Sequence, residues 1–333
     1  MATNKLIDSF GREITYLRLS ITDRCNLRCQ YCMPAEGIDI VKKTELLTYK
    51  EMYRIIRVLS ELGVNKVRLT GGEPFVRKEF MTFLEKLNFN KNLKEINITT
   101  NGALISKHID SLEKLNVKNI NLSIDSLHAA NFKKITRRDV FSQVYNTLEI
   151  LEKSALNLKL NVVVQSGINT NEIKDFVLLT KHKDLSVRFI EEMPFNGKGQ
   201  RKTLENWNYN RILQEINDNY TNIIKLKDSK SSTSKNFKIE GFKGNFGIIP
   251  AFTRTICNDC NRIRITATGL FKNCLFDDGV FNIRDFIRNG ASDDEIKQLF
   301  IDTIAKKPKN GFIAEANRKS QKGVSESMST IGG

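Results

Sequence analysis

Residues 14–34 read ITYLRLSITDRCNLRCQYCMP, an alternating apolar run followed by three cysteines within eight residues. The apolar run over 14–21 predicts a β-strand, and the spacing of Cys25, Cys29 and Cys32 places three thiolates close enough for one metal centre. A structural zinc site normally has four protein ligands, whereas a four-iron cluster can leave one iron without a protein ligand. This stretch therefore favours an iron–sulfur cluster whose open iron can bind a small molecule.

The other three cysteines form a second group, Cys257, Cys260 and Cys274. Disulfide pairing is one alternative for an even number of cysteines. However, the first twenty residues show no signal-peptide pattern, and no run approaches the roughly 18 apolar residues of a membrane span. We therefore expect a cytoplasmic, reducing setting that preserves thiolate ligands. No histidine lies near the second group in sequence, yet zinc and an iron–sulfur cluster both remain open for it alone. Beside the first group, the cluster is the better interpretation.

The chain of 333 residues carries a formal net charge of +15 and is 40% hydrophobic. This length allows one large domain or one domain with an appendage, and the absence of low-complexity runs indicates a globular protein. The positive charge suggests an anionic partner, which could be nucleic acid, a membrane surface or a phosphorylated substrate. Solvated lysines would give the same total, so charge alone does not choose among these partners.

Between residues 14 and 191, apolar segments typical of strands alternate with amphipathic segments typical of helices. Thr48 and Glu51 form a capping box that begins the clearest helix, and Asp139 and Thr170 are predicted N-caps of two later helices. Six strands alternating with helices predict a parallel sheet with right-handed crossovers. Periodicity leaves open whether this sheet is doubly wound or a barrel short of the usual eight strands. The predicted strands are 14–21, 64–70, 93–99, 119–124, 158–164 and 185–190.

In either fold the active site lies at the carboxyl ends of the strands, and polar segments follow most of the predicted strands at that edge. The glycines of the segment after the second strand would let a ligand approach the backbone, although an ordinary turn would serve there equally well. The segments are the cysteine loop, TGGEP at 70–74, TNG at 100–102, SIDS at 123–126 and EEMP at 191–194.

Beyond residue 195 the strand–helix pattern weakens. Residues 229–235, SKSSTSK, predict an exposed turn or linker. Residues 246–249 and 263–267 resemble strands and flank or carry the second cysteine group.

Several predicted strands carry a basic residue, which is costly inside a parallel sheet unless the charge is paired or binds an anion. Lys66 and Arg68 are two residues apart and therefore point to the same side. If that side is the lumen, the cations converge on a phosphate-sized ligand; if it is the outside, they extend between helices to solvent. The number of such residues favours the lumen. They are Arg18, Lys66, Arg68, Lys159 and Arg188.

Arg262 and Arg264 alternate on a predicted strand directly after Cys260, so they face one way beside the second cysteine group. Guanidinium groups suit phosphate and purine recognition, although a solvated basic strand face is the common alternative. The terminal Gly332 and Gly333 could thread into a narrow site with little steric cost, but the sequence alone favours a frayed end.

Together these motifs resemble the GTP 3′,8-cyclases, the radical S-adenosylmethionine (SAM) enzymes that begin molybdenum cofactor biosynthesis. The resemblance rests on the cysteine loop with its following Met-Pro, the GGEP, TTNG, SIDS and RFIE segments, CNDCNRIR with the later Cys274, and the closing MSTIGG. It runs from about residue 11 to the last residue. One departure is KPKNG at 307–311, where the family pattern is Lys-Pro-x-x-His.

The resemblance implies an α/β fold, an incomplete parallel (β/α)6 TIM-type barrel with a C-terminal extension that carries a second iron–sulfur site. The barrel core would occupy residues 1–195, and the extension with its Gly-Gly tail residues 196–333. The tail is expected to reach into the active site. Two [4Fe–4S] clusters are implied, one chelating SAM and held by Cys25, Cys29 and Cys32, the other meeting the guanine of GTP and held by Cys257, Cys260 and Cys274.

The resemblance also implies ligand-binding side chains, and no catalytic side chain beyond the cofactors. Positions that match the SAM site are Tyr31, Gly72, Ser123 and Met193. Positions that match the GTP site are Arg18, Arg68, Thr99, Lys159, Arg262, Ile263 and Arg264, with Lys66 and Arg188 as further candidates.

The activity implied is that of a lyase that converts GTP to 3′,8-cyclo-7,8-dihydro-GTP. A radical derived from SAM takes hydrogen from C3′ of GTP, and the ribose radical then attacks C8 of guanine. The implied partners are GTP, a low-potential electron donor of the flavodoxin or ferredoxin type and the next enzyme, cyclic pyranopterin monophosphate synthase; a homodimer is allowed, and no membrane or nucleic acid is expected. The alternatives are a radical SAM enzyme that modifies a peptide or tRNA, and a zinc-stabilised nucleic-acid-binding module.

Overall fold

The computed structural model describes residues 5–195, 207–319 and 326–332. One twelve-stranded sheet runs through this part of the chain in the order β12-β11-β10-β1-β2-β3-β4-β5-β6-β9-β8-β7. Its strands are β1 (Tyr16–Ser20), β2 (Lys66–Thr70), β3 (Glu95–Thr100), β4 (Val117–Ser123), β5 (Asn157–Val164), β6 (Ser186–Glu191), β7 (Ile223–Lys225), β8 (Lys235–Ile239), β9 (Asn245–Ile249), β10 (Arg262–Ile265), β11 (Leu270–Lys272) and β12 (Phe281–Asn282).

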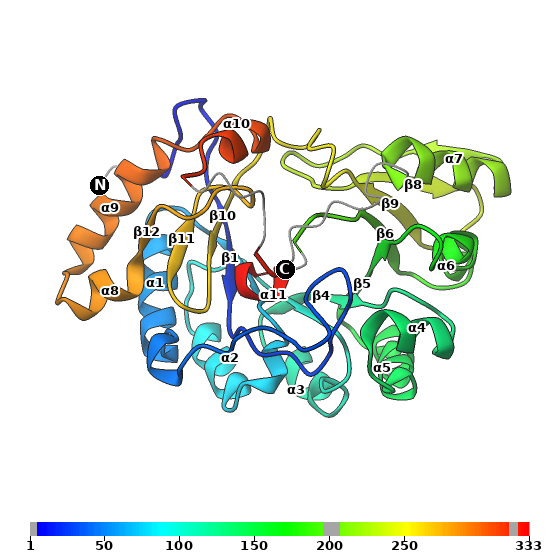
Figure 1. Ribbon diagram of the computed structural model, residues 1–333, viewed down its shortest axis with the longest axis horizontal. Coiled ribbons are helices and arrows are strands. Elements are labelled where there is room, and N and C mark those ends of the chain that lie inside the picture. Colours follow the sequence, from blue (N-terminus) through cyan, green and yellow to red (C-terminus); the bar gives the residue numbers. More distant parts are fainter. Residues whose placement is uncertain (1–4, 196–206, 320–325, 333) are drawn as a thin grey trace.

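The sheet curves around a concave face, and the helices between its central strands cover the convex face (Figure 1). The helices are α1 (Tyr49–Glu61), α2 (Phe80–Asn88), α3 (Ile109–Glu113), α4 (Ala129–Thr136), α5 (Phe141–Lys153), α6 (Ile173–Leu179), α7 (Tyr209–Asn219), α8 (Ile283–Arg288), α9 (Asp293–Ile304), α10 (Gly311–Ala316) and α11 (Met328–Ile331). The last of these, α11, lies on the concave side (Figure 1).

Strands β1 to β6 pair in parallel and in chain order, which confirms the predicted incomplete parallel barrel. The six predicted strands agree with the observed ones to within a few residues. Strands β9 and β10, from the C-terminal region, were not predicted to join this sheet. Strand β10 pairs in parallel with β1, and β9 pairs in parallel with β6, so both edges of the barrel are extended from the far end of the chain.

The strands alternate between a face buried against the helices and a face that is polar. On β1 the side chains of Leu17 and Leu19 are fully buried, and Ile263 and Ile265 of the neighbouring β10 lie in the same hydrophobic core. Arg18 and Arg264 are register partners on the opposite face. The inward face therefore holds cations where a closed eight-stranded barrel would pack branched aliphatic residues.

Helix α1 begins as predicted. Thr48 Oγ1 accepts a hydrogen bond from Glu51 N–H, and Glu51 caps the Thr48 backbone in return. The two other predicted N-caps are wrong. The Asp139 carboxylate is exposed and pairs with Lys133. Helix α5 begins at Phe141 with Val140 as its N-cap, and no side chain caps it. Thr170 begins a short 3-10 helix that leads into α6.

Residues 229–234 lie in the connection from β7 to β8, as a predicted turn should, and Lys235 is the first residue of β8. However, the prediction that they are simply exposed is incomplete, because Ser234 is buried and Thr233 lines the central cavity. Among the described helices, none is long and apolar enough to cross a membrane.

Candidate active site

A cavity of about 500 Å³ opens on the concave face of the sheet, and both cysteine groups line it. We call Cys25, Cys29 and Cys32 the first trio, and Cys257, Cys260 and Cys274 the second trio. All six thiols are free, so the disulfide alternative is not observed. No group of three Cys, His, Asp or Glu side chains within the described ranges is close enough to hold a single metal ion.

The loop that carries the first trio is held against the GGEP segment by very close backbone packing. A Cβ atom on Gly72 would lie 2.1 Å from Arg24 O, so only glycine fits there. Gly72 N–H donates to Thr22 O at 2.7 Å. Next to it, the buried Glu73 carboxylate accepts hydrogen bonds from Thr100 Oγ1 at 2.8 Å and from Asn101 N–H at 2.7 Å. The loops after β1, β2 and β3 are thereby fixed to one another.

The chemistry of the first trio fits a metal cluster better than three free thiols, because burial disfavours the free thiolate. Burial raises the pKa of Cys25 to about 11 and that of Cys32 to about 12, and it raises the pKa of Cys29 well above its ordinary value. A buried thiol of this kind loses its proton readily only when a positive metal centre replaces it. Two hydrogen bonds orient the Cys25 side chain: its Sγ accepts from Leu27 N–H at 3.3 Å and from Asn101 Nδ2 at 3.7 Å.

The second trio has different electrostatic surroundings. For Cys260, burial disfavours the thiolate, but the charges of Lys307 and Arg262 outweigh that effect and lower the pKa to about 6. Burial raises the pKa of Cys274, and Lys307 opposes that rise. The Cys257 carbonyl accepts from Arg12 Nη1 at 3.0 Å, and Arg12 Nε in turn pairs with the buried Asp8 carboxylate at 2.6 Å.

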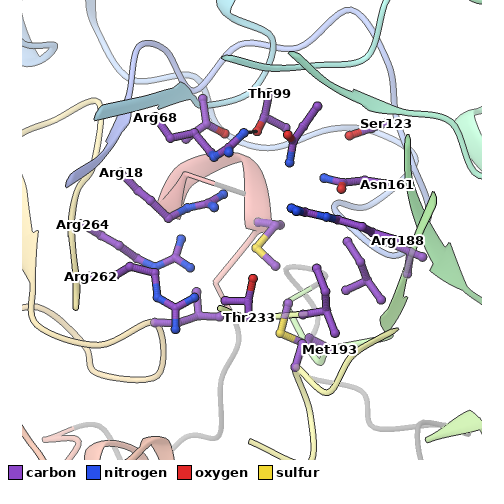
Figure 2. A pocket seen from close by; sticks show the side chains of 18 of the residues that line it. Arg18, Arg68, Thr99, Ser123, Asn161, Arg188, Met193, Thr233, Arg262 and Arg264 are labelled. Atoms are coloured by element: carbon purple, nitrogen blue, oxygen red, sulfur yellow. Dashed lines mark hydrogen bonds between the residues drawn. The ribbon is translucent and has the colours of Figure 1, made fainter. Parts of the chain in front are cut away.

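The basic strand residues all line the cavity, which confirms that they face the lumen. Figure 2 shows Arg18, Arg68, Arg262 and Arg264 extending toward the same space from one side. On the other side, Ser123, Asn161, Arg188 and Met193 face them (Figure 2). Arg68 bonds Tyr16 Oη at 2.5 Å and Thr99 Oγ1 at 3.3 Å.

Most of these inward cations are not balanced by a carboxylate. Lys66 pairs with Glu95 at 2.7 Å, whereas Arg68, Lys159, Arg188 and Arg264 form no ion pair with a carboxylate within the described ranges. Burial together with the charges of Arg188 and Arg68 lowers the pKa of Lys159 to about 8. Burial also lowers the pKa of Arg188 to about 10, with Arg68 adding to the effect. A bound polyanion would supply the missing negative charge.

Most of the predicted ligand-binding residues lie on this cavity. Tyr31, Gly72, Ser123 and Met193 line it, as do Arg18, Arg68, Thr99, Lys159, Arg262 and Arg264. Ile263 is the exception, because its side chain is fully buried in the hydrophobic core on the other face of β10. Only its backbone could contact a ligand. Tyr31 Oη donates to Asp125 Oδ2 at 2.9 Å. Burial raises the pKa of this Asp125 carboxyl to about 6.

The C-terminal tail is ordered, so the frayed end favoured by sequence alone is wrong as far as Gly332. Gly332 O accepts from Arg264 Nη1 at 2.9 Å and from Arg18 Nη2 at 3.4 Å. Ser327 Oγ donates to Cys32 O at 2.8 Å, which ties the start of α11 to the first trio. Gly333 lies outside the described residues. Helix α10 starts inside the KPKNG departure, where Asn310 accepts from Ile313 N–H.

Several cavity residues were missed by sequence reasoning. Asn121 and Asn161 line the cavity, and the Oδ1 atom of each is buried without a hydrogen-bond partner among the described residues. Asn161 lies two residues after Lys159 on β5, so strand parity could have identified it. Thr233 points its hydroxyl into the cavity from the β7–β8 turn (Figure 2). No periodicity marks that residue, because its position depends on hairpin packing.

Two family models cover most of the chain. The model of the radical SAM superfamily matches residues 19–180, and the model of Molybdenum Cofactor Synthesis C matches residues 185–313. Among solved structures, the fold is similar to SuiB of Streptococcus suis with a TM-score of 0.62 and 16% identity, covering 93% of this chain and 70% of that one.

Curated relatives are similar over nearly the whole chain. A GTP 3′,8-cyclase of Petrotoga mobilis is 39% identical, with 98% of this chain and 100% of that protein aligned. The mitochondrial GTP 3′,8-cyclase of Arabidopsis thaliana is 39% identical over 92% of this chain and 78% of its own length. The molybdenum cofactor biosynthesis protein moc-5 of Caenorhabditis elegans is 41% identical over 98% of this chain. The chain spans only about half of that protein, 54%, and 48% of the Dictyostelium discoideum relative.

The partial barrel, the cysteine loop and these matches define a radical SAM protein, a class that uses a [4Fe–4S] cluster and SAM. Within that class, the chain belongs to the GTP 3′,8-cyclase family of molybdenum cofactor biosynthesis.

Proposed function

We propose that this chain converts GTP to 3′,8-cyclo-7,8-dihydro-GTP, the cyclisation that opens molybdenum cofactor biosynthesis. The observation that carries the proposal is a single cavity that is lined by two cysteine trios and by several basic side chains, of which Arg68, Lys159, Arg188 and Arg264 form no ion pair with a carboxylate in the described part of the chain. Family membership and the names of the Petrotoga and Arabidopsis relatives support the same activity.

The first trio would hold the cluster that binds SAM. Tyr31, Gly72, Ser123 and Met193 would line the SAM site, and all four border the cavity on the side of the first trio's loop or of β4 and β6. When bound, the first cluster and SAM supply the radical that removes hydrogen from C3′ of GTP. The chain contributes a fixed cysteine loop, because Gly72 and Glu73 hold it against the neighbouring loops.

The second trio would hold a further [4Fe–4S] cluster and orient the guanine of GTP. Arg262 and Arg264 follow the second trio on β10 and face the cavity. Arg18, Arg68, Thr99 and Lys159 line the same cavity from β1, β2, β3 and β5, and Arg18 is the register partner of both Arg264 and Arg68. GTP brings about four negative charges, which these buried cations would offset in place of water. The site thus suits a nucleoside triphosphate better than a neutral peptide.

The lumen must also protect the reaction from water and from side reactions. Helix α11 contributes Met328 and Ser329 to the cavity wall, and Gly332 reaches Arg264. Removal of this tail would open the space between the two trios. We therefore assign the tail to closing the site.

The remaining assignments follow from the same activity. We propose a barrel core over 1–195 and an extension over 196–333, although the strands of both form one sheet. An electron carrier of the flavodoxin or ferredoxin type would reduce the first cluster, and cyclic pyranopterin monophosphate synthase would use the product. We propose a cytoplasmic location; the Arabidopsis relative is named mitochondrial.

Anaerobic reconstitution tests the proposal. The expected protein is brown, binds about eight irons per chain in two four-iron clusters, and forms 5′-deoxyadenosine from SAM faster when GTP is present. A colourless zinc protein with salt-dependent RNA or DNA binding would support the nucleic-acid-binding alternative instead. About four irons per chain, without a response to GTP, would contradict the second cluster. Cys274→Ser should keep the first cluster and lose cyclisation.

A further inference from the structure

Lys307 is a buried lysine directly behind the second trio, in the KPKNG segment that the proposed reaction leaves without a role. Its residue exposure is 3%, which is rare for lysine unless the charge is compensated. Lys306, one residue earlier, is exposed and lies at the end of α9. The chain therefore turns this one ammonium group inward.

The Lys307 ammonium joins the two segments that carry Cys260 and Cys274. Its Nζ donates to Arg262 O at 2.9 Å and to Asn273 O. Arg262 lies two residues after Cys260, and Asn273 immediately precedes Cys274. The next residues of the segment are also anchored, because the carbonyls of Pro308 and Lys309 accept from Arg12, which bonds Cys257 O as well.

No acidic side chain in the described ranges forms an ion pair with Lys307, although neighbouring buried cations have such partners. Arg12 pairs with Asp8, and Lys272 pairs with Glu326 at 3.1 Å. The nearby acid Asp277 is engaged by backbone donors, because its carboxylate accepts from Cys274 N–H and Gly279 N–H. No carboxylate of the described residues therefore offsets the Lys307 ammonium group directly, and charges interact strongly in a medium of low dielectric constant.

The first trio has buried carboxylates beside it instead. Glu73 accepts from Asn101 N–H, and the Asn101 side chain contacts Cys25 Sγ. Asp125 accepts from Tyr31 Oη, next to Cys32 in the same loop. Beside the second trio, the buried Lys307 ammonium donates to Arg262 O and Asn273 O. The two cysteine groups therefore differ in the buried ionisable groups that lie nearest to them.

We propose that Lys307 is the counter-cation of the second cluster: it balances the charge of the thiolates and keeps the reduction potential of this cluster above that of the first. The inference rests on the proposed function, since it requires a cluster at the second trio. Net charge and hydrogen bonds around the sulfurs set the potential of an iron–sulfur cluster. A positive charge stabilises the reduced form, which is the more negative one, so its removal must lower the potential. Lys307 is thus a positioning residue that acts through the cluster.

The test uses the full chain reconstituted with both clusters, and compares the wild type with Lys307→Met, Lys307→Gln and the exposed control Lys306→Met. Lys307→Met removes the charge and the hydrogen bonds, whereas Lys307→Gln keeps a donor without the charge. The readouts are an EPR-monitored redox titration and the loss of iron to a chelator. The first cluster is recognised by the change in its signal when SAM is added, and it serves as the internal control for folding.

We expect both Lys307 variants to shift the second cluster to a more negative potential and to retain its iron about 10- to 100-fold less well. The first cluster and the Lys306→Met variant should behave as the wild type does. Loss of the second cluster from both Lys307 variants, with the first cluster intact, would also support a need for the charge. A wild-type potential in Lys307→Gln would overturn the proposal, because a hydrogen-bond donor alone would then suffice. If the wild type itself holds one cluster only, the proposed function fails instead.

Discussion

At position 72 the backbone lies so close to the cysteine loop that no side chain fits between them. The ideal Cβ of an alanine there would lie 2.1 Å from Arg24 O and 2.4 Å from the Arg24 carbonyl carbon. Because both obstacles are backbone atoms, the strain cannot be relieved by a rotamer change. The glycine therefore determines where the first trio lies relative to β2.

Gly72→Ala should displace the cysteine loop and cost about 1–3 kcal/mol of stability, as overpacking usually does. The iron held by the first trio should fall while that of the second trio stays. Gly63→Ala is the matched control: its φ is +97°, yet no atom lies within 4 Å of its Cβ position. It should lower the free energy of unfolding by about 1 kcal/mol without loss of iron. Equal iron contents in the two variants would contradict this account.

We expect Lys159 to make the proposed binding of GTP depend on pH. Its pKa in the empty cavity is about 8, because burial and the nearby charges of Arg188 and Arg68 disfavour the ammonium form. A bound polyanion favours that form and raises the pKa, so binding above pH 8 takes up a proton. The affinity for GTP should be highest below pH 8 and should fall above it by at most about tenfold per pH unit.

Lys159→Arg should bind GTP with a much flatter pH dependence, since arginine stays protonated over this range. Anaerobic isothermal titration calorimetry at several pH values measures the slope. Tyr16 also has a pKa of about 8: burial raises it, but Arg68 and Arg18 outweigh that effect. A slope that survives in Lys159→Arg would therefore contradict the role of Lys159 and assign the titration to Tyr16.

The residues that could be found from sequence are those whose position follows from strand parity. Lys66 and Arg68 point into the lumen because β2 is regular, and the same argument reaches Asn161 from Lys159. Parity also explains the one error among the predicted ligand residues, since Ile263 lies between Arg262 and Arg264 and must face the core. Thr233 and Lys307 could not be found, because hairpin packing brings Thr233 to the cavity and a buried turn brings Lys307 behind the second trio.

At the scale of elements, Glu191 joins three parts of the fold: the end of β6, the start of α7 and the turn after β9. It ends β6, and its carboxylate accepts from Tyr209 N–H at the start of α7 at 2.7 Å. The same carboxylate accepts from Phe252 N–H and Thr253 N–H after β9, both at 2.8 Å. The chain from β9 toward Cys257 therefore starts from a fixed point.

Glu191→Gln should weaken this junction, because an amide nitrogen would face backbone donors. The expected cost is about 1.5–3 kcal/mol, the usual range for hydrogen bonds to a charged group. The melting temperature should fall, and iron in the second trio should be less well retained. Glu192→Gln is the control: the Glu192 carboxyl has a pKa raised to about 7 by burial and Asp125, so loss of its charge should matter little. Equal effects of the two variants would refute the junction.

Sequence patterns identified the six central strands because each is a short segment with regularly placed apolar residues, followed by a turn. They did not reveal that β9 and β10 extend the same sheet, because pairing with β6 and β1 is a contact between distant parts of the chain. The predicted N-cap at Asp139 was wrong because of a contact that the sequence pattern does not reveal. Asp139 could cap α5 in principle, but an ion pair with Lys133 is available to it instead.

At the scale of the whole molecule, the fold brings β1 and segments from the C-terminal region together around one cavity. Strand β10 lies beside β1, both cysteine trios line the cavity, and α11 lies on the same concave side. Several basic side chains are buried around this cavity rather than spread over the surface, and they account for part of the net charge of +15. The central claim is that SAM and GTP meet in this cavity.

Transfer of deuterium from GTP labelled at C3′ to 5′-deoxyadenosine tests that claim most directly. The reconstituted, reduced chain is incubated with SAM and the labelled GTP, and the 5′-deoxyadenosine is analysed by mass spectrometry. We predict that it carries deuterium, and that Cys274→Ser forms 5′-deoxyadenosine without the label. Unlabelled 5′-deoxyadenosine from the wild-type chain, in the presence of both intact clusters and GTP, would contradict the account.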